Sequence, residues 1–175
     1  MDAVQIRILS ESDPETISAE FRNIGWGKLV AQYECYLAEQ TAGSRICFVA
    51  NVDGKFAGYV TVNWAPQYIG AVELGIPEIE DLNVLPAFRR KGIGTRLLER
   101  AEEEVALRSN VVGIGVGLHP AYNAAQRLYV KRGYIPDGRG GTYRNTYVQE
   151  GTRVVLDDDL VLHFTKLLVQ RPARD

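Results

Sequence analysis

The sequence predicts an α/β fold in which helices flank a mixed β-sheet, and two observations support that prediction. Alternating apolar residues predict strands over residues 45–51 and 55–63, joined by Asp53-Gly54, a pair typical of two-residue hairpins. Farther along, strand and helix patterns alternate, which is typical of strands joined through crossover helices. With 175 residues and no visible linker, residues 1–175 are expected to form a single domain.

The chain around this hairpin gives further signals. A short alternating strand is predicted over residues 5–9, and two helices over residues 14–22 and 28–40. Residues 64–77 hold two prolines and two glycines and are expected to be irregular. The later elements are predicted as a strand over 78–84, a helix over 93–108, a strand over 111–118, a helix over 121–132, a strand that begins at 134–136, an irregular glycine-rich stretch over 137–158 and a last strand over 160–168.

Composition and charge argue against several classes of function. A net charge of −2 and a pI near 5.8 give no basic footprint of the kind that nucleic-acid binding favours. Cys35 and Cys47 form no CxxC pair, so a reduced protein with packing thiols is expected. His119 and His163 have no metal-like spacing and are interpreted as structural or surface residues. Because the N-terminus lacks a signal-peptide pattern and no apolar run approaches ~20 residues, a cytoplasmic protein is expected.

The most informative segment is the loop before the helix predicted over residues 93–108. Arg89, Arg90 and Lys91 crowd the N-terminal end of that helix, where the helix dipole disfavours cations. Gly92 and Gly94 weaken the first turn of this helix, but they let a ligand approach the backbone. Both features fit a bound phosphate held by free N–H groups. The alternative is a solvated basic loop whose glycines only ease a turn.

The sequence Arg89-Arg90-Lys91-Gly92-Ile93-Gly94 resembles the (Q/R)-x-x-G-x-(G/A) signature of the GNAT acetyltransferases. Val84 and Pro86 stand where that family has its V-x-P, and neither the Walker A nor the GxGxxG pattern occurs. The resemblance implies that main-chain amides of this loop hold the pyrophosphate of coenzyme A. It also implies a mostly antiparallel mixed sheet with one splayed pair of parallel strands, between which the pantetheine arm passes.

The following strand and helix add independent support. Gly113, Gly115 and Gly117 share one face of the predicted strand, which suits a close ligand and the tight packing of a helix equally well. The next helix resembles a second GNAT signature, A-x-x-L-Y-x-K-x-G-(F/Y). Its matching residues are Ala125, Leu128, Tyr129, Lys131, Gly133 and Tyr134. Where the family often has a cofactor-binding Asn, this chain has Tyr122, and Asn123 is one position away.

The chemistry of amine acetylation needs an acid, a base and a group that polarises the thioester. The resemblance implies that the main-chain amide near Val84 hydrogen-bonds the thioester carbonyl and that Tyr129 donates a proton to the departing thiolate. The alternative for Tyr129 is a buried core residue. Strand alternation places Glu78 and Glu80 on the face of Val84 and Asp81 on the opposite face. Glu78 and Glu80 are therefore favoured as the base, although both suit ordinary polar residues at a strand start.

These interpretations define the candidate site. The catalytic candidates are Tyr129, Glu78 and Glu80. The candidates for binding acetyl-CoA are Leu82, Asn83, Val84, Arg89, Arg90, Lys91, Gly92, Ile93, Gly94, Thr95, Tyr122, Asn123 and Ala125. Aromatic residues that would line an amine pocket are Trp26, Trp64, Tyr68, Tyr143 and Tyr147, although packing explains them equally well.

The predicted function is acetyl-CoA-dependent transfer of an acetyl group to a primary amine, by direct attack in a ternary complex. The acceptor would be a small molecule or a protein amine, and neither a metal, nor nucleic acid, nor a membrane is expected as a partner. The expected oligomeric state is a monomer or a homodimer. Two alternatives stay open: a non-catalytic acyl-CoA sensor or regulatory module, and a phosphate- or nucleotide-binding protein that uses the same loop.

Overall fold

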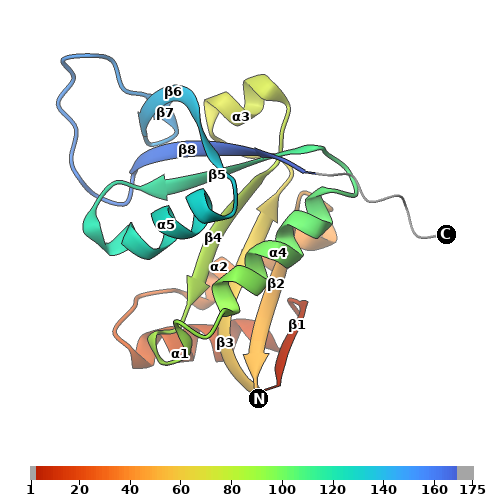
Figure 1. The fold of residues 1–175 in the computed structure, drawn as a ribbon. Helices are drawn as coiled ribbons and strands as arrows, with labels where there is room; N and C mark the ends of the chain where they lie inside the picture. The colour runs from red at the N-terminus through yellow and green to blue at the C-terminus, as the bar shows by residue number, and fades with distance from the viewer. Residues whose placement is uncertain (1–2, 169–175) are drawn as a thin grey trace. The chain divides into compact units, whose positions relative to one another are not determined.

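The computed structural model describes residues 3–168, whose strands and helices alternate as Figure 1 shows. The elements of the first half are β1 (Val4–Ile8), α1 (Asp13–Asn23), α2 (Val30–Thr41), β2 (Arg45–Val52), β3 (Lys55–Asn63), α3 (Ile69–Leu74) and β4 (Glu78–Val84). Those of the second half are η1 (Pro86–Phe88), α4 (Ile93–Val105), β5 (Val111–Gly117), η2 (Pro120–Tyr122), α5 (Asn123–Lys131), β6 (Ile135–Tyr143), β7 (Thr146–Tyr147) and β8 (Leu160–Leu167).

The strands form one mixed sheet, with hydrogen-bonded neighbours in the order β1-β2-β3-β4-β5-β8-β6-β7. The pairs β1–β2, β2–β3, β5–β8, β6–β8 and β6–β7 are antiparallel, whereas β4 and β5 are parallel. The parallel ladder joins Glu78 to Gly113 and Ile79 to Ile114. The predicted α/β fold with a mostly antiparallel mixed sheet and flanking helices is therefore confirmed.

The chain divides into two compact units, each built from two stretches of sequence. The first unit comprises Met1–Trp64 and Glu80–Glu103, and the second comprises Ala65–Ile79 and Glu104–Asp175. Strand β4 contributes its first two residues to the second unit and the rest to the first. The prediction of a single domain over residues 1–175 stays a prediction.

In the first unit, the two faces of β2 pack against different helices. Cys47 and Val49 join a buried cluster with Ile17 and Phe21 of α1 and Tyr33 of α2. On the alternate face, the ring of Phe48 lies under the guanidinium group of Arg100 from α4, 4.2 Å away. Figure 1 accordingly shows α4 crossing in front of β2 and β3. Hence the amphipathic pattern that predicted α4 marks the side of this sheet that the helix covers.

The hairpin between β2 and β3 turns where the sequence predicted. Asp53 and Gly54 both have positive φ values, 48° and 78°, the conformation that a two-residue hairpin turn of this type requires. Glycine adopts it without steric cost, and aspartate is one of the residues that tolerates it. The turn pairs Val52 with Lys55, and a register shift between Ala50 and Asn51 then places Cys47 opposite Thr61 and Val49 opposite Tyr59.

The structure corrects three expectations about secondary structure. Residues 64–77 contain a short helix, α3, which ends at Gly75 in the left-handed conformation. The glycine-rich stretch after residue 137 continues β6 to Tyr143 and adds β7, although the register shifts between Pro136 and Gly141. The helix predicted over 121–132 begins with the separate turn η2. Among the described helices, none has the length and the hydropathy needed to span a bilayer.

Candidate active site

Asp81 in strand β4 has a φ of +53°, and we call this departure from the extended backbone, which interrupts the alternation of side chains, the bulge of β4. At the same place the neighbouring strand β3 carries Gly58. A Cβ atom there would overlap the main-chain carbonyl oxygen of Asn83 and come within 3.1 Å of the Cα atom of Val84. Gly58 is therefore required by the close approach of β3 to the bulged part of β4.

At this bulge, the Asp81 carboxylate lies among hydrogen-bond donors from four segments of the first unit. Oδ1 accepts hydrogen bonds from Lys28 Nζ at 2.8 Å and Asn83 Nδ2 at 2.7 Å. Oδ2 accepts them from Gln32, Tyr36 and Tyr59, at distances of 2.8, 2.9 and 2.5 Å. Five donors thus surround one carboxylate, and we call this group the Asp81 cluster.

The charge state of Asp81 follows from this environment. Burial acts to raise the pKa of Asp81, but the Lys28 ammonium and the hydroxyls of Tyr59 and Tyr36 outweigh it, so the pKa lies below its ordinary value. Burial, together with the Asp81 charge, raises the pKa of Tyr59 well above its ordinary value. Asp81 is therefore a stably ionised carboxylate, and its proton affinity is too low for an efficient base.

Glu80 also lies in an ion pair. Its Oε2 atom accepts a hydrogen bond from Arg45 Nη1 at 2.9 Å, and its Oε1 atom accepts one from Asn63 Nδ2 at 3.1 Å. Asn63 and Tyr59 share a face of β3, so Glu80 and Asp81 contact the same face of the sheet. The expectation that Asp81 points away from Glu80 is wrong, because the bulge cancels one alternation.

The loop after β4 leads into α4 through two left-handed residues, Arg90 (φ 60°) and Gly92 (φ 78°). Space around Gly92 is open, so it is the backbone conformation that calls for glycine there. The first turn of α4 contains no acidic side chain. Arg96 N–H donates to the Gly92 carbonyl at 3.0 Å, so the preceding N–H groups of the first turn have no helical acceptor. Such an end is suited to an anion.

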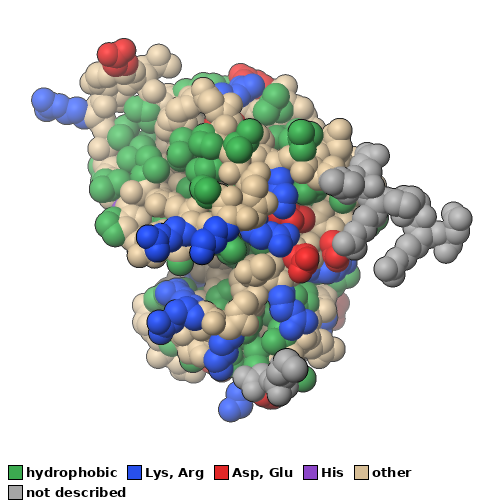
Figure 2. All heavy atoms as spheres, in the orientation of Figure 1, with side chains coloured by type: hydrophobic (Ala, Val, Ile, Leu, Met, Phe, Trp, Pro, Cys, Tyr) green, Lys and Arg blue, Asp and Glu red, His purple; other side chains and the backbone are tan. Residues whose placement is uncertain are grey.

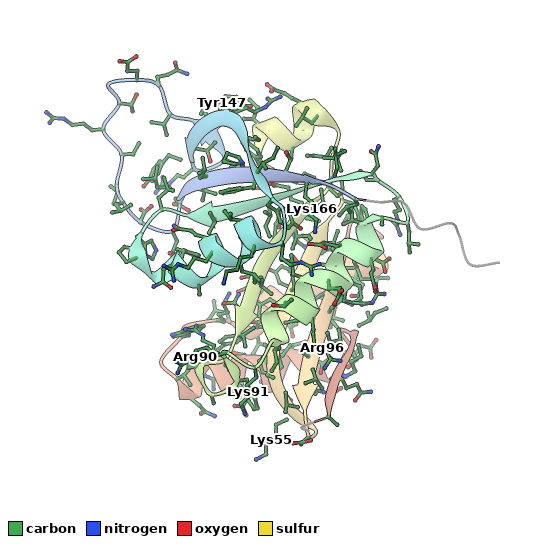
Figure 3. All side chains as sticks on the ribbon, viewed as in Figure 1. Lys55, Arg90, Lys91, Arg96, Tyr147 and Lys166 are labelled. Carbon is green, nitrogen blue, oxygen red and sulfur yellow. The ribbon has the colours of Figure 1, made fainter. Side chains whose placement is uncertain are left out.

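The three basic residues of this loop have different surroundings. Arg89 Nε donates to the Val84 carbonyl at 3.0 Å, and its guanidinium group lies over the ring of Trp26 at 5.4 Å. Arg90 is exposed, and Lys91 Nζ lies 5.8 Å from the ring centre of Phe88. Figure 2 shows Lys and Arg side chains gathered on this surface, and Figure 3 places Arg90 and Lys91 on the loop itself. Arg89 thus fixes the loop, whereas Arg90 lies in solvent.

In the second unit, the glycine-bearing face of β5 is covered by side chains. A Cβ atom at Gly113 would lie 3.1 Å from Cγ of Glu78, and one at Gly115 would lie 3.0 Å from Cε1 of His163. At Gly117 it would overlap the ring of Tyr122. The sequence left open whether a ligand or a helix packs here, and in this unit side chains from β4, η2 and β8 fill the space.

Glu78 and His163 form a buried pair on this face. His163 Nδ1 lies 3.0 Å from Glu78 Oε1, and the two side chains are 6% and 5% exposed, respectively. His163 Nε2 lies 3.1 Å from Thr142 Oγ1 on β6. The ring of Tyr68 stacks on the His163 ring, with 3.5 Å between centroids. His163 is therefore buried and hydrogen-bonded, and its partner Glu78 is a catalytic candidate.

Tyr68 connects this pair to the segments that the sequence marked as irregular. Its hydroxyl donates to Asp137 on β6, and burial followed by that hydrogen bond raises the pKa of Tyr68. Its ring meets the ring of Tyr147 edge-on, and Arg139 donates to the Tyr147 hydroxyl at 2.7 Å. Tyr147, labelled in Figure 3, is the last residue of β7. Two of the proposed pocket aromatics thus contact each other.

Tyr129 lies on α5, the residue is 5% exposed, and its ring centroid lies 5.9 Å from that of Tyr134. Burial, and secondarily Tyr122, raises the pKa of Tyr129, so the hydroxyl stays protonated at physiological pH. Among residues 3–168 the Tyr129 hydroxyl has no hydrogen-bond partner, yet it is not one of the sealed, unpartnered atoms such as the hydroxyl of Tyr33. It therefore keeps contact with solvent-accessible space.

The remaining residues predicted on α5 lie at its start. Tyr122 donates to Asp158 at 3.0 Å, with the ring of His119 packed against it, and Asn123 is the first residue of the helix. Gln126 Nε2 donates to the Gly117 carbonyl at 2.8 Å, which ties α5 to the end of β5. No group of three His, Cys, Asp or Glu side chains within the described residues is arranged to hold a metal ion.

The structure thus places the predicted residues in two groups. Leu82, Asn83, Val84 and the loop that contains Gly92, Ile93, Gly94 and Thr95 belong to the first unit, whereas Glu78, Tyr122, Asn123, Ala125 and Tyr129 belong to the second. Sequence reasoning missed the partners Lys28, Arg45 and His163, because none lies at a recognisable interval from its carboxylate. The signal in the sequence for such partners is the run of three acidic residues between Glu78 and Asp81, because buried carboxylates need donors.

Comparison with known proteins agrees with this architecture. The model of the Acetyltransferase (GNAT) family matches residues 8–134. Among solved structures, the putative acetyltransferase yncA from Salmonella typhimurium, determined with its cofactor acetyl-CoA, is 20% identical, with 99% of this chain and 98% of that chain covered and a TM-score of 0.68.

Two further structures are similar over most of their length. The ribosomal-protein-alanine N-acetyltransferase from Brucella melitensis is 20% identical, with 94% of this chain and 99% of that chain covered and a TM-score of 0.68. Arabidopsis thaliana NAA60, in complex with a bisubstrate analogue, is 18% identical, with 97% and 100% covered and a TM-score of 0.68. At these identities the likeness concerns the fold.

Proposed function

This chain belongs to the GNAT acetyltransferase family, and from that premise we propose that it transfers the acetyl group of acetyl-CoA to a primary amine by direct attack in a ternary complex. The observation that carries the proposal is the family match over residues 8–134, which includes the whole of β4, the basic loop and α4. The activity class is acetyl transfer, and no resident metal or other cofactor is needed for it.

The pyrophosphate of acetyl-CoA is assigned to the loop before α4. The N–H groups of Gly92, Ile93, Gly94 and Thr95 precede Arg96, whose N–H is the first to have a helical acceptor, and a helix N-terminus favours an anion by its dipole. Arg90, which is exposed, and Lys91 supply positive charge around it. Arg89 is assigned a supporting role, because its side chain already holds the Val84 carbonyl and Trp26.

The acetyl end is assigned to the end of β4 and to residues of η2 and α5. Main-chain groups of Leu82, Asn83 and Val84 would bind the pantetheine arm and polarise the thioester carbonyl. Tyr122, Asn123 and Ala125 on η2 and α5 would contact the cofactor. Tyr129 has a protonated hydroxyl without an internal partner, so it is suited to donate to the departing thiolate.

The base that takes the ammonium proton is assigned to the acidic run of β4, with Glu78 and Glu80 as candidates. The acceptor is a primary amine of a small molecule or of a protein. Residues 64–77 and 137–158 would recognise it, since Tyr68, Tyr147 and Arg139 link these segments. Free thiols at Cys35 and Cys47 suit the cytoplasm. A monomer or homodimer, without nucleic acid as a partner, stays a prediction.

Calorimetric titration with acetyl-CoA tests the cofactor assignment. The unmodified protein is expected to bind in the micromolar range, and the double variant Gly92→Glu/Gly94→Glu is expected to lose binding, because two carboxylates then occupy the anion site. Gly27→Ala is the control, since Gly27 has open space around it and lies far along the chain from this loop. If the unmodified protein does not bind acetyl-CoA, the proposal is overturned.

A further inference from the structure

Three consecutive aspartates hold the C-terminal end of residues 148–159, the segment that joins β7 to β8. The segment is exposed over most of its length, and Figure 1 shows it leaving the sheet after β7 and returning at the start of β8. At its end, the Tyr143 hydroxyl donates to Asp157 at 3.0 Å. Arg144 donates to Asp159 at 3.2 Å, so both aspartates attach the segment to the place where β6 turns into β7.

The middle aspartate, Asp158, contacts a different part of the second unit. Its Oδ1 atom lies 2.8 Å from Nε2 of His119 and accepts a hydrogen bond from the Tyr122 hydroxyl at 3.0 Å. His119 precedes the turn η2 and Tyr122 ends it, and this turn leads from β5 into α5. Because the Asp158 side chain is 78% exposed, these contacts contribute little to the stability of the fold. Their main consequence is the position of Tyr122.

Contacts on three sides determine where the Tyr122 ring lies. The ring packs against Gly117 at the end of β5, where an added Cβ atom would overlap it. The ring of His119 meets it at a steep angle, with 4.8 Å between centroids. Asp158 holds the hydroxyl. Together these contacts select one of the rotamers that a tyrosine can adopt, and the hydrogen bond to Asp158 is the polar contact among them.

Tyr122 is one of the residues assigned to contact acetyl-CoA, and its hydroxyl proton is already donated to Asp158. We propose that Asp158 is a positioning residue for acetyl-CoA binding: it holds the Tyr122 ring in the orientation that contacts the cofactor. The proposal rests on the proposed function, since it assumes that acetyl-CoA binds and that Tyr122 touches it. It also connects residues 148–159 to the cofactor through a single side chain.

The negative charge of Asp158 makes this role separable from a purely electrostatic one. The phosphates of acetyl-CoA are anionic, so a nearby carboxylate repels them. If Asp158 acted by its charge alone, its removal would strengthen acetyl-CoA binding. If it acts by holding Tyr122, its removal weakens binding, because the ring then has to be ordered when the cofactor binds. The two roles therefore predict changes in affinity of opposite sign.

Calorimetric titration with acetyl-CoA tests the positioning role through a double-mutant cycle. Asp158→Ala should weaken binding about five- to tenfold, whereas Asp158→Asn, whose amide oxygen can still accept from Tyr122, should stay within about twofold. Tyr122→Phe removes the same hydrogen bond from the other side and should weaken binding by a similar factor. In the Tyr122→Phe background, Asp158→Ala should then change the affinity by less than about twofold.

Asp159→Ala is the matched control for charge. It removes one negative charge from the neighbouring position, but its side chain pairs with Arg144 and not with Tyr122. Binding of acetyl-CoA should therefore stay within about twofold of that of the unmodified chain. Tighter binding by Asp158→Ala, or a loss that is equally large with and without the Tyr122 hydroxyl, would overturn the proposal.

Limited proteolysis without any cofactor separates this proposal from the proposed function. Trypsin cleaves after Arg153, an exposed residue of the same segment, and mass spectrometry identifies that cut. Because loss of the contact lets the segment open more often, Asp158→Ala should be cut there severalfold faster, and Asp158→Asn at nearly the rate of the unmodified chain. If the unmodified chain does not bind acetyl-CoA, the proposed function fails, and the cleavage rates still show whether Asp158 holds the segment. Equal rates in Asp158→Ala and the unmodified chain would overturn the positioning role.

Discussion

Asp81 and Glu78 are two carboxylates of one strand, three residues apart, and their surroundings differ in kind. Asp81 in the first unit accepts five hydrogen bonds, one of them from an ammonium group. Glu78 in the second unit accepts one hydrogen bond, from a histidine. The comparison teaches that burial alone does not mark a catalytic acid or base. What matters is whether an oxygen remains available and whether a cation already neutralises the group.

The largest expected effect is on turnover in Glu78→Gln. The amide keeps an acceptor for His163 Nδ1–H but cannot take a proton, so kcat should fall by about 10²- to 10⁴-fold. Stability should change by less than about 1 kcal/mol, because the hydrogen bond remains. Steady-state kinetics and urea unfolding of the same preparation check both parts. Equal turnover in the variant and the unmodified chain would remove Glu78 from the chemistry.

Asp81→Asn should show the opposite pattern, with a loss of about 2–3 kcal/mol of unfolding free energy. The amide cannot accept from all five donors, and Lys28 loses its counterion. Because the pKa of Asp81 is lower in the folded state than its ordinary value of 3.8, its ionised form stabilises the fold above that value. The stabilisation is lost as the pH falls through 3.8 toward the folded pKa.

Urea unfolding at pH 7 and at a series of acidic pH values measures this difference. The gap between the unmodified chain and Asp81→Asn should close as the pH falls below about 4. A gap that stays constant with pH would show that the charge of Asp81 is not what stabilises the cluster.

A smaller effect is expected where Gly58 of β3 approaches the main chain of β4 after Asp81. In Gly58→Ala the new methyl group would overlap the Asn83 carbonyl oxygen, and the strands must move apart, at a cost of about 1–3 kcal/mol. Gly27→Ala is the matched control, because a Cβ atom there meets nothing within 4 Å. Equal urea midpoints for the two variants would mean that β3 and β4 do not approach each other as closely as the structure has them.

The smallest effects concern the basic loop. Arg89→Ala removes the hydrogen bond to the Val84 carbonyl and the contact with Trp26, so about 1 kcal/mol of stability should be lost. Arg90→Ala should leave stability within about 0.5 kcal/mol and weaken acetyl-CoA binding severalfold, since its exposed charge belongs to the loop of the proposed anion site. Thermal unfolding and calorimetry separate the two roles, and a reversed pattern would exchange them.

Much of the fold could be predicted because its signals are local. The Asp53-Gly54 turn, the strand Glu78–Val84 and the amphipathic α4 each depend on residues near one another in sequence. Helix α3 escaped prediction because six residues between two prolines show no periodicity. The start of β6 was predicted at residues 134–136, but its continuation to Tyr143 was not, because Gly138 and Gly140, both with positive φ, interrupt its alternation.

The candidate site was predictable to the level of motifs and not of partners. The loop Arg89–Gly94 and the position of Tyr129 follow from spacing in the sequence. The choice between Glu78, Glu80 and Asp81 depends on Lys28, Arg45 and His163, which reach them from other strands and loops. The left-handed backbone of Asp81, which no local sequence pattern predicts, also changes which side chains share a face of the strand.

The most direct test of the account is the release of coenzyme A thiol from acetyl-CoA in the presence of a panel of primary amines, with Tyr129→Phe as the matched variant. The account predicts amine-dependent release by the unmodified chain, about 10²-fold slower release by Tyr129→Phe and unchanged binding of acetyl-CoA. Binding of acetyl-CoA without thiol release for any amine would contradict it and favour an acyl-CoA sensor, as would equal rates in the two proteins.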